Sequence, residues 1–306
     1  MDKVNEALNI IKLGAKMSEH YYQAPLLICN SGGKDSLVIL ALAKMAGINY
    51  EVQHSLTTVD APETMKYVRK QMHELELQGV PVEIRKPTYK GERTSMMQLI
   101  PLKGPPTRIK RYCCSILKEA AGNHRAIATG LRADESRNRA ERTEIESVTG
   151  RRNEGEHLNF EDAADLFEKD INRQAVEHDE AFLRSCRVKG KTAINPIINW
   201  SSADVWDFIH AEKLEYNPLY DMGFSRVGCI GCPMARCKDR QKEFSIWPQY
   251  ERAYKAAFQR FLDKCQERGK PDLWGGNLDA MWHWWMEDGI ITGQQTLWED
   301  ENNGSD

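Results

Sequence analysis

A polar, glycine-rich loop separates two apolar segments near the start of the chain. The segment PLLIC at 25–29 reads as a strand, SGGKDS follows at 31–36, and DSLVILALAKMAG at 35–47 reads as a helix that Gly47 ends. A strand, a glycine-rich turn and a helix can bind phosphate, because glycines let backbone N–H groups approach the oxygens and the helix N-terminus adds partial positive charge. The two glycines are adjacent, whereas a Walker A loop has four residues between its first glycine and its Gly-Lys pair. The alternative is an ordinary turn between a strand and a helix.

Charged and hydroxyl side chains of this loop add to its backbone donors. Lys34 would place a point charge on a phosphate, and Asp35 could reach a Mg²⁺ ion. The hydroxyl groups of the two serines would donate further hydrogen bonds. We therefore expect a phosphate-binding set of Ser31, Gly32, Gly33, Lys34, Asp35 and Ser36.

Four cysteines form two pairs in segments that lie far apart in the sequence. RYCCSILKE contains Cys113 and Cys114, and GCIGC contains Cys229 and Cys232. A C-x-x-C segment presents two thiolates on one loop, as iron–sulfur and zinc sites need, and the tandem pair completes a set of four ligands. Ligand count alone leaves the choice between iron–sulfur and zinc open.

The remaining cysteines stand alone. Cys29, Cys186 and Cys265 lie in apolar or helical contexts, so we expect them to pack in the core. Cys237 follows the C-x-x-C segment, and it is an extra thiol for sulfur transfer, a substitute ligand or a plain helix residue. Eight cysteines without a secretory signal favour a reducing compartment, where ligands and buried thiols are commoner than disulfides.

A second set of candidate residues follows the fourth predicted strand. The segment TGLRADESRNR at 129–139 contains Arg132, Arg137 and Arg139, whose guanidinium groups suit bidentate anion binding. The alternative is a solvated helix face on which charges of both signs alternate.

Apolar runs alternate with helical patterns over the first two thirds of the chain. The predicted strands are PLLIC, YEVQHSL, VPVEIRK, HRAIATGLR and TAINPII. Strands separated by helices predict an α/β fold with a parallel, doubly wound sheet, and ligands bind at the carboxyl ends of its strands. The last seventy residues or so carry helical patterns only, which we expect to form an appendage. The predicted organisation is an N-terminal helix at 1–22, a nucleotide-binding α/β domain at 23–232 with a charged helical insertion at about 151–190, a helical region at 233–295 and a disordered tail at 296–306.

Overall charge and hydropathy narrow the functional classes. With 42 basic and 45 acidic residues the net charge is −3, so no global field favours nucleic acid. A local basic run of Lys103, Arg108, Lys110 and Arg111 suits a phosphate-bearing substrate. The N-terminal segment lacks the pattern of a signal peptide, and no apolar stretch approaches the length of a membrane span. We expect a cytoplasmic protein with no membrane partner.

The loop SGGKDS after a strand resembles the PP-loop of the ATP pyrophosphatase superfamily, whose fold is adenine nucleotide alpha hydrolase-like. Further segments resemble the phosphoadenosine phosphosulfate (PAPS) reductase family of bacteria, phages and mobile elements, over about residues 20–290. These segments are TGLRADESRNR, INPIINWSSADVWDFI, YNPLYDMGFSRVGCIGCP and FSIWPQYERAY. The resemblance implies an adenine nucleotide ligand and a 4Fe–4S cluster close to the substrate, bound by Cys113, Cys114, Cys229 and Cys232.

The resemblance also implies further nucleotide-binding residues. The loop LTTVDAPET corresponds to a family loop close to the nucleotide, with Thr58 and Asp60 as candidates, although Asp60 also suits an ordinary turn. Adding the arginine segment gives a nucleotide-binding set of Ser31, Gly32, Gly33, Lys34, Asp35, Ser36, Thr58, Asp60, Gly130, Arg132, Arg137 and Arg139.

One departure from the family pattern shapes the expected activity. Sulfonucleotide reductases end in a Glu-Cys-Gly-Leu-His segment that carries the nucleophile, and this sequence has no cysteine after Cys265. We therefore expect an enzyme that binds ATP with Mg²⁺ and adenylates a substrate for sulfur transfer, as in DNA phosphorothioation or RNA thiolation. Lys34, Asp35 and Arg132 would be catalytic, and the partners would include nucleic acid or a sulfur donor such as a cysteine desulfurase or a thioredoxin-like protein. The alternatives are a PAPS or adenosine phosphosulfate (APS) reductase that uses a partner's thiol, and a non-catalytic, nucleotide-sensing subunit of a complex.

Overall fold

A computed structural model describes most of the chain. The described residues are 2–119, 122–135, 137–148, 157–172 and 191–287. Contacts between residues divide the chain into two compact units, each described by itself. The first unit contains residues 1–56, 60–87 and 118–228, and the second contains 57–59, 88–117 and 229–306.

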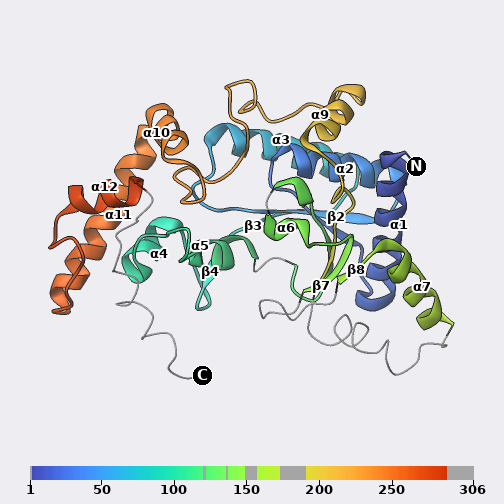
Figure 1. Ribbon diagram of the computed structural model, residues 1–306, viewed down its shortest axis with the longest axis horizontal. Coiled ribbons are helices and arrows are strands. Elements are labelled where there is room, and N and C mark those ends of the chain that lie inside the picture. Colours follow the sequence, from blue (N-terminus) through green and yellow to red (C-terminus); the bar gives the residue numbers. More distant parts are fainter. Residues whose placement is uncertain (1, 120–121, 136, 149–156, 173–190, 288–306) are drawn as a thin grey trace. The chain divides into compact units, whose positions relative to one another are not determined.

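A seven-stranded sheet forms the centre of the first unit (Figure 1). Its strand order is β3-β2-β1-β6-β9-β7-β8. The strands from β3 to β9 in this order are parallel, whereas β7 runs antiparallel to both β9 and β8. Their bounds are β1 Leu26–Cys29, β2 Tyr50–Ser55, β3 Val82–Arg85, β6 Ala126–Ala128, β7 Ile145–Val148, β8 His157–Leu158 and β9 Lys191–Ile194. The predicted α/β fold is therefore confirmed, but the sheet is mainly parallel rather than parallel throughout.

Both faces of this sheet are buried, as its apolar strands predict. Leu26 and Ile28 of β1 join the main core together with α1 and α2. Leu27 points to the opposite face, because side chains alternate along a strand, and it forms a small buried cluster with Ile127 and Ala193.

The helices of the first unit begin and end at recognisable sequence signals. An Asp2 cap precedes α1 (Lys3–Tyr22), Gly47 in a left-handed conformation ends α2 (Lys34–Ala46), and Pro62 starts α3 (Pro62–Leu77). A complete capping box of Ser201 and Asp204 starts α9 (Ser202–Ala211). Two shorter helical segments follow β6, the 3₁₀ turn Ala133–Glu135 and α6 (Arg137–Ala140).

The range expected as a charged insertion, about 151–190, is described only at 157–172. There β8 pairs with β7 at the sheet edge, and α7 (Phe160–Ile171) follows it. Ala163, Leu166 and Phe167 of α7 are buried in the main core, so the described helix packs on the unit with one apolar face.

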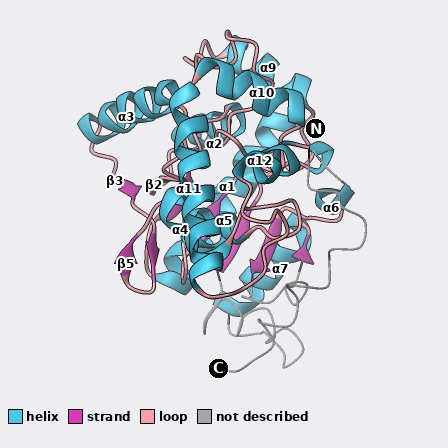
Figure 2. Ribbon diagram, turned by 90° about the vertical axis from the view of Figure 1, so that its left-hand side faces the viewer, coloured by secondary structure: helices cyan, strands magenta, loops and turns pink. Residues whose placement is uncertain are grey.

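The second unit combines a hairpin with helices from two distant parts of the chain. The hairpin is β4 (Thr88–Tyr89) with β5 (Glu92–Arg93), and α4 (Met96–Lys103) and α5 (Tyr112–Cys114) follow it. A π-helical turn continues α5 at Ser115–Glu119. The C-terminal helices are α10 (Cys237–Ile246), α11 (Pro248–Glu267) and α12 (Leu278–Met286). Helix α4 packs along α11, as Figure 2 shows.

This packing changes the domain boundary expected from the sequence. The predicted α/β domain at 23–232 contains residues 88–117, but the structure groups these residues with the C-terminal helices. The physical reason is the long contact of α4 with α11, which includes Phe261 against Gly104. No described helix is long and apolar enough to cross a membrane.

Candidate functional site

The glycine-rich loop lies between the carboxyl end of β1 and the start of α2, as the sequence predicts. Gly32 has a φ of +77°, and a Cβ there would lie 2.8 Å from a methyl group of Val68, so the position requires glycine. Side chains hold the loop amides: the Asn30 Oδ1 atom accepts from the Gly32 N–H at 2.9 Å, and the Ser36 Oγ atom accepts from the Ser31 N–H at 3.2 Å. The Asn217 side chain donates to the Gly32 carbonyl oxygen at 2.9 Å. The loop is therefore ordered by hydrogen bonds from its amides to polar side chains, and another acceptor can replace these side chains.

Two buried cations share one carboxylate beside this loop. The Lys34 Nζ atom lies 3.0 and 2.9 Å from the two oxygens of Asp35, and the Arg132 Nε atom lies 2.7 Å from the first of them. The side chains of Lys34 and Arg132 are only 7% and 5% exposed. Arg132 also contacts the carboxylates of Asp134 at 3.3 Å and Glu135 at 3.6 Å. The trio presents two buried cations to one carboxylate, and both types of cation can also pair with other anions such as phosphate.

Gly130 allows the loop after β6, which carries Arg132, to reach α2. A Cβ at Gly130 would lie 2.8 Å from the carbonyl carbon of Asp35 and 3.0 Å from the Ser36 nitrogen. The loop after β6 therefore approaches the backbone of the first turn of α2 as closely as only glycine permits. This approach places Arg132 against Asp35.

Tyr220, Arg139 and Arg226 belong to the same site. The Tyr220 hydroxyl accepts from the Lys34 N–H at 2.8 Å, and burial raises the pKa of this hydroxyl to about 12, so it stays neutral. Burial, and next the charge of Arg226, lowers the pKa of Arg139. Arg139 forms an ion pair with Glu135. Tyr220 and Arg226 lie in the segment YNPLYDMGFSRVGCIGCP, which carries the family resemblance. No local pattern in that segment indicates that these two residues belong to the site.

The other predicted nucleotide-binding residues are distributed differently. Thr58 belongs to the second unit, where its Oγ1 atom accepts from the Met96 N–H at 2.9 Å and fixes the start of α4. Asp60 belongs to the first unit, in a bridge position before α3. The side chain of Arg137 lies outside the described residues. Within the first unit the structure therefore brings together the loop, Gly130, Arg132 and Arg139.

The four predicted ligand cysteines all belong to the second unit, where they lie near one another. Hydrogen bonding with Cys114, then burial, then the thiols of Cys229 and Cys232 raise the pKa of Cys113. The same thiols contribute to the raised pKa of Tyr254, whose main cause is complete burial. No disulfide links the seven cysteines that the structure describes.

The C-x-x-C turn is held rigidly. Gly231 has a φ of +69°, and a Cβ there would lie 2.8 Å from Phe244 and 3.0 Å from Tyr254. The Gly231 N–H donates to Glu243 at 2.7 Å, and the Tyr254 hydroxyl donates to the Ile230 carbonyl at 3.0 Å. Aromatic side chains therefore set the position of the turn between Cys229 and Cys232.

This donor set fits a metal cluster. The neighbouring thiols raise the pKa of Cys113, and a bound metal would offset this cost of ionisation because it binds the thiolate. Among the described residues, no three His, Cys, Asp or Glu side chains are grouped closely enough to hold a single metal ion. In a 4Fe–4S cluster each cysteine binds a different iron, so the four sulfur ligands lie farther apart than around one ion.

The other cysteines that the structure describes have packing contexts. Cys265 is buried in α11, and burial raises the pKa of its thiol. Burial likewise raises the pKa of Cys29 to about 11. Cys237 is the first residue of α10, and Cys186 lies outside the described residues.

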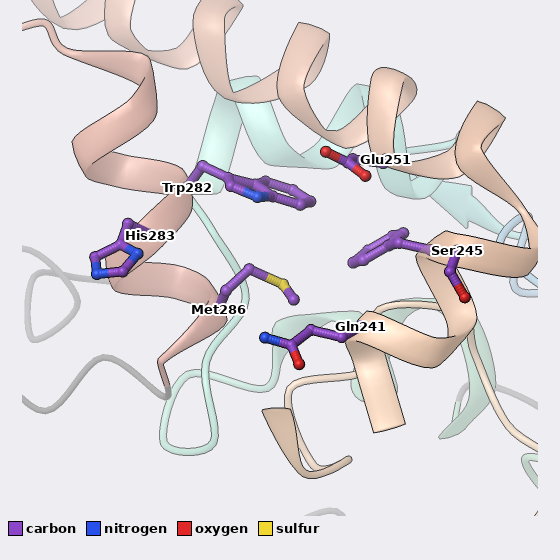
Figure 3. A pocket seen from close by; sticks show the side chains of 7 residues that line it. Gln241, Ser245, Glu251, Trp282, His283 and Met286 are labelled. Atoms are coloured by element: carbon purple, nitrogen blue, oxygen red, sulfur yellow. The ribbon is translucent and has the colours of Figure 1, made fainter. Parts of the chain in front are cut away.

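A pocket of about 330 Å³ lies among the C-terminal helices of the second unit (Figure 3). Trp282 and Met286 of α12 face Gln241 of α10 across it, and Glu251 of α11 lies at its edge. The Lys255 Nζ atom lies 4.9 Å from the centre of the Trp282 ring. None of the predicted site residues lines this pocket.

A parallel sheet with a glycine-rich loop, followed by helices, defines the adenine nucleotide alpha hydrolase-like class. The chain belongs to the phosphoadenosine phosphosulfate reductase domain family, whose model matches residues 25–235. The match contains the loop, the arginine segment and all four paired cysteines. Family membership implies an adenine nucleotide as the ligand.

Similar proteins differ in how much of the chain they match. An uncharacterized protein of Methanocaldococcus jannaschii is 27% identical over 284 residues, which are 91% of this chain and 56% of that protein. An adenosine 5'-phosphosulfate reductase of Bacillus cereus is 22% identical over 238 residues, 76% of this chain and 82% of that protein. The crystal structure of the PAPS reductase of Candida auris, a phosphate complex, is 18% identical with a TM-score of 0.43 and covers 73% of this chain and 88% of its own. The chain spans about half the length of the archaeal relatives that it matches, 56% of one and 41% of another.

Proposed function

We propose that this protein binds ATP at the Lys34–Asp35–Arg132 site and transfers the adenylyl group to a substrate that then accepts sulfur. The observation that carries the proposal is the pair of buried cations that share one carboxylate beside a glycine-rich loop. A polyphosphate can take the place of Asp35 as the partner of Lys34 and Arg132. Asp35 is then available to hold the Mg²⁺ ion that accompanies ATP.

The chemistry follows from these positions. An oxygen of the substrate attacks the α-phosphorus of ATP, the bond from that phosphorus to the bridging oxygen breaks, and pyrophosphate leaves. Lys34, Arg132 and the loop amides stabilise the negative charge that develops on the phosphate oxygens. A sulfur nucleophile supplied by a donor protein then displaces AMP from the substrate, so one C–O or P–O bond is exchanged for a bond to sulfur.

Cys113, Cys114, Cys229 and Cys232 would hold a 4Fe–4S cluster in the second unit. When bound, such a cluster would supply iron whose positive charge offsets part of the negative charge of the four thiolates. Iron and acid-labile sulfide in anaerobically purified protein test this assignment. Zinc without iron would contradict it, and so would iron content that survives a Cys113→Ser, Cys232→Ser double substitution.

A second candidate function is reduction of an adenylated sulfate with a partner's thiol. The similarity to an adenosine 5'-phosphosulfate reductase, which covers 82% of that enzyme, favours it. The same cation site would then bind the phosphosulfate, and a thioredoxin-like protein would supply the attacking thiol.

One experiment separates these functions. Full-length, anaerobically purified protein is incubated with ATP labelled in the α-phosphate, together with tRNA and genomic DNA, and separately with adenosine phosphosulfate and reduced thioredoxin. We expect AMP and pyrophosphate from ATP, lost in Lys34→Met and retained in Lys44→Met, which changes an exposed lysine of the same helix. Sulfite from the phosphosulfate supports the reductase instead, and nucleotide binding without turnover of either compound supports a sensing subunit.

A further inference from the structure

The second unit contains a segment with strong positive charge. Residues 88–117 include six basic side chains and one acidic side chain, whereas the whole chain has 42 basic and 45 acidic residues. Residues 57–59 and 229–287, the rest of the described second unit, have ten basic and eight acidic side chains. The positive charge of this unit is therefore concentrated in the hairpin, in α4 and in the turn that follows α4.

Contacts with aromatic rings join the hairpin, α4 and α5. The Lys103 Nζ atom, at the end of α4, lies 5.0 Å from the ring centre of Tyr89 in the hairpin and 5.9 Å from that of Tyr112 in α5. The Lys90 Nζ atom lies 5.8 Å from the Tyr89 ring. The Tyr112 hydroxyl donates to the Gly104 carbonyl at 2.7 Å, which ties α5 to the end of α4. Figure 1 shows the hairpin next to α4 and α5.

The hairpin turn holds a lysine in an unusual conformation. Lys90 and Gly91 have φ values of +52° and +84°, the pattern of a turn that favours Asn, Asp or Gly at both positions. A lysine there is less favourable than asparagine, and it places a cation at the tip of the hairpin. Tyr89 pairs with Glu92 across the two strands, and Thr88 pairs with Arg93.

The turn after α4 adds more cations and an exposed apolar side chain. The Thr107 N–H donates to the Lys110 carbonyl at 3.2 Å, and the Lys110 N–H donates to the Thr107 Oγ1 atom at 2.9 Å. Ile109 at its tip is 78% exposed. Arg111 follows the turn and reaches the sulfur of Met234 at 3.9 Å.

We propose that these elements form a binding surface for a single-stranded polynucleotide. We call this surface the basic face, and its cations are Lys90, Arg93, Lys103, Arg108, Lys110 and Arg111. The proposal rests on the proposed function, because it names the substrate class whose sulfur modification the protein would serve. Cysteine pair Cys113–Cys114 follows the basic face directly in the sequence.

The chemistry of the basic face selects this ligand. Lysine and arginine side chains bind the phosphate of each nucleotide, and an aromatic ring such as Tyr89 stacks on an unpaired base. A duplex presents phosphates but no free base for Tyr89 or for the exposed Ile109. A single strand, whether RNA or DNA, uses both the cations and the apolar side chains.

Fluorescence anisotropy of labelled oligonucleotides tests the proposal in full-length protein. The probes are a 20-nucleotide RNA, single-stranded DNA of the same sequence, and the corresponding DNA duplex, each measured from low to moderate salt. A triple variant with Lys90→Gln, Lys103→Gln and Arg108→Gln removes three charges and keeps an unbranched polar side chain at each position. A control variant with Lys12→Gln, Lys16→Gln and Arg69→Gln removes the same charges from exposed positions of α1 and α3 in the first unit.

We expect a single strand to bind the wild type more tightly than the duplex does. The salt slope of single-strand binding changes by about 0.7 for each phosphate contact, so three lost contacts weaken binding about 10²-fold at 0.1 M salt. The control should bind as the wild type does. Equal loss in both variants, no loss in the basic-face variant, tighter duplex binding or no binding by the wild type would each overturn the proposal.

ATP binding by the same variants keeps this outcome separate from the proposed function. If the basic-face variant binds ATP normally and the wild type binds no strand, the surface proposal fails while ATP binding stands. If the wild type binds a strand but never releases pyrophosphate from ATP, the proposed function fails instead. Comparison of RNA with single-stranded DNA identifies which polynucleotide is preferred.

Discussion

Replacing Asp35 by asparagine removes the charge of this side chain and keeps its shape. The Asp35 carboxylate is 20% exposed, while its partners Lys34 and Arg132 are 7% and 5% exposed. Asparagine retains one acceptor oxygen but turns an amide N–H group toward a cation. The substitution therefore leaves two buried positive charges without their shared negative charge.

The expected cost follows from this burial. Removing one partner of a buried ion pair destabilises a protein by about 3–5 kcal/mol, because the remaining charge is uncompensated. Since water reaches part of Asp35, we expect the lower end of that range, about 3 kcal/mol in the free energy of unfolding. ATP offers phosphate oxygens to the same two cations. A ligand at 100 times its Kd adds about 2.7 kcal/mol, so ATP should recover most of the loss.

Urea unfolding followed by far-ultraviolet circular dichroism measures both effects. Wild type and Asp35→Asn are compared without ligand and with ATP in EDTA, which isolates the contact of phosphate with the cations from that of Mg²⁺. We expect ATP to stabilise Asp35→Asn more than it stabilises the wild type. Glu51→Gln is the matched control, since Glu51 pairs with Arg125 at 3.0 Å in the same unit with 30% and 24% exposure of the side chains.

The control pair is a partly exposed ion pair, worth at most about 1 kcal/mol, and ATP should not rescue its loss. The reasoning is refuted if Asp35→Asn unfolds at the same urea concentration as the wild type. It is also refuted if ATP stabilises Asp35→Asn no more than it stabilises the wild type or Glu51→Gln.

Three further predictions concern the same unit. Gly130→Ala places a Cβ 2.8 Å from the Asp35 backbone, so we expect the free energy of unfolding to fall by about 1–3 kcal/mol and ATP to bind more weakly. A melting temperature and ATP affinity equal to those of the wild type would contradict the close approach. Tyr220→Phe removes the acceptor of the Lys34 N–H, so the ligand-free protein should lose about 1 kcal/mol in urea unfolding, a loss that ATP should reduce; a variant as stable as the wild type would show that the hydroxyl is dispensable. Burial raises the pKa of Cys29 from 9.0 to about 11, so the buried neutral thiol contributes its full stability below pH 9 and loses it as the pH rises through 11. Mass spectrometry should therefore find alkylation of Cys29 slow at pH 8 and faster between pH 9 and 11. Rapid alkylation at pH 8 would disprove the burial argument.

The parallel strands could be predicted from the sequence, but the antiparallel edge could not. Continuous apolar runs such as LLIC are typical of strands with two buried faces. In β7 the carboxylate of Glu146 is only 1% exposed and pairs with Arg142 and His157. A buried ion pair looks like an exposed polar stretch in the sequence, and β8 has only two residues. Neither strand therefore gives a recognisable pattern.

The candidate site shows the same division between local and long-range information. The loop at 31–36 and Arg132 could be predicted because a strand, a glycine turn and a helix are local features, and because a parallel sheet brings loop ends to one edge. The contact of Tyr220 with the Lys34 amide joins residues 186 positions apart, and no local pattern contains it. The contact of the Thr58 hydroxyl with the Met96 amide joins residues 38 positions apart, and no local pattern contains it either.

Equilibrium binding of ATP tests the central claim most directly. Calorimetric titration of full-length wild type, Lys34→Gln and Lys44→Gln compares a buried lysine of the loop with an exposed lysine of the same helix. We predict that ATP binds the wild type and Lys44→Gln alike and binds Lys34→Gln about 10- to 100-fold more weakly, as the loss of a charge-assisted hydrogen bond of about 1.5–3 kcal/mol requires. Equal binding by Lys34→Gln, or no binding of ATP by the wild type, would contradict a nucleotide phosphate held at Lys34.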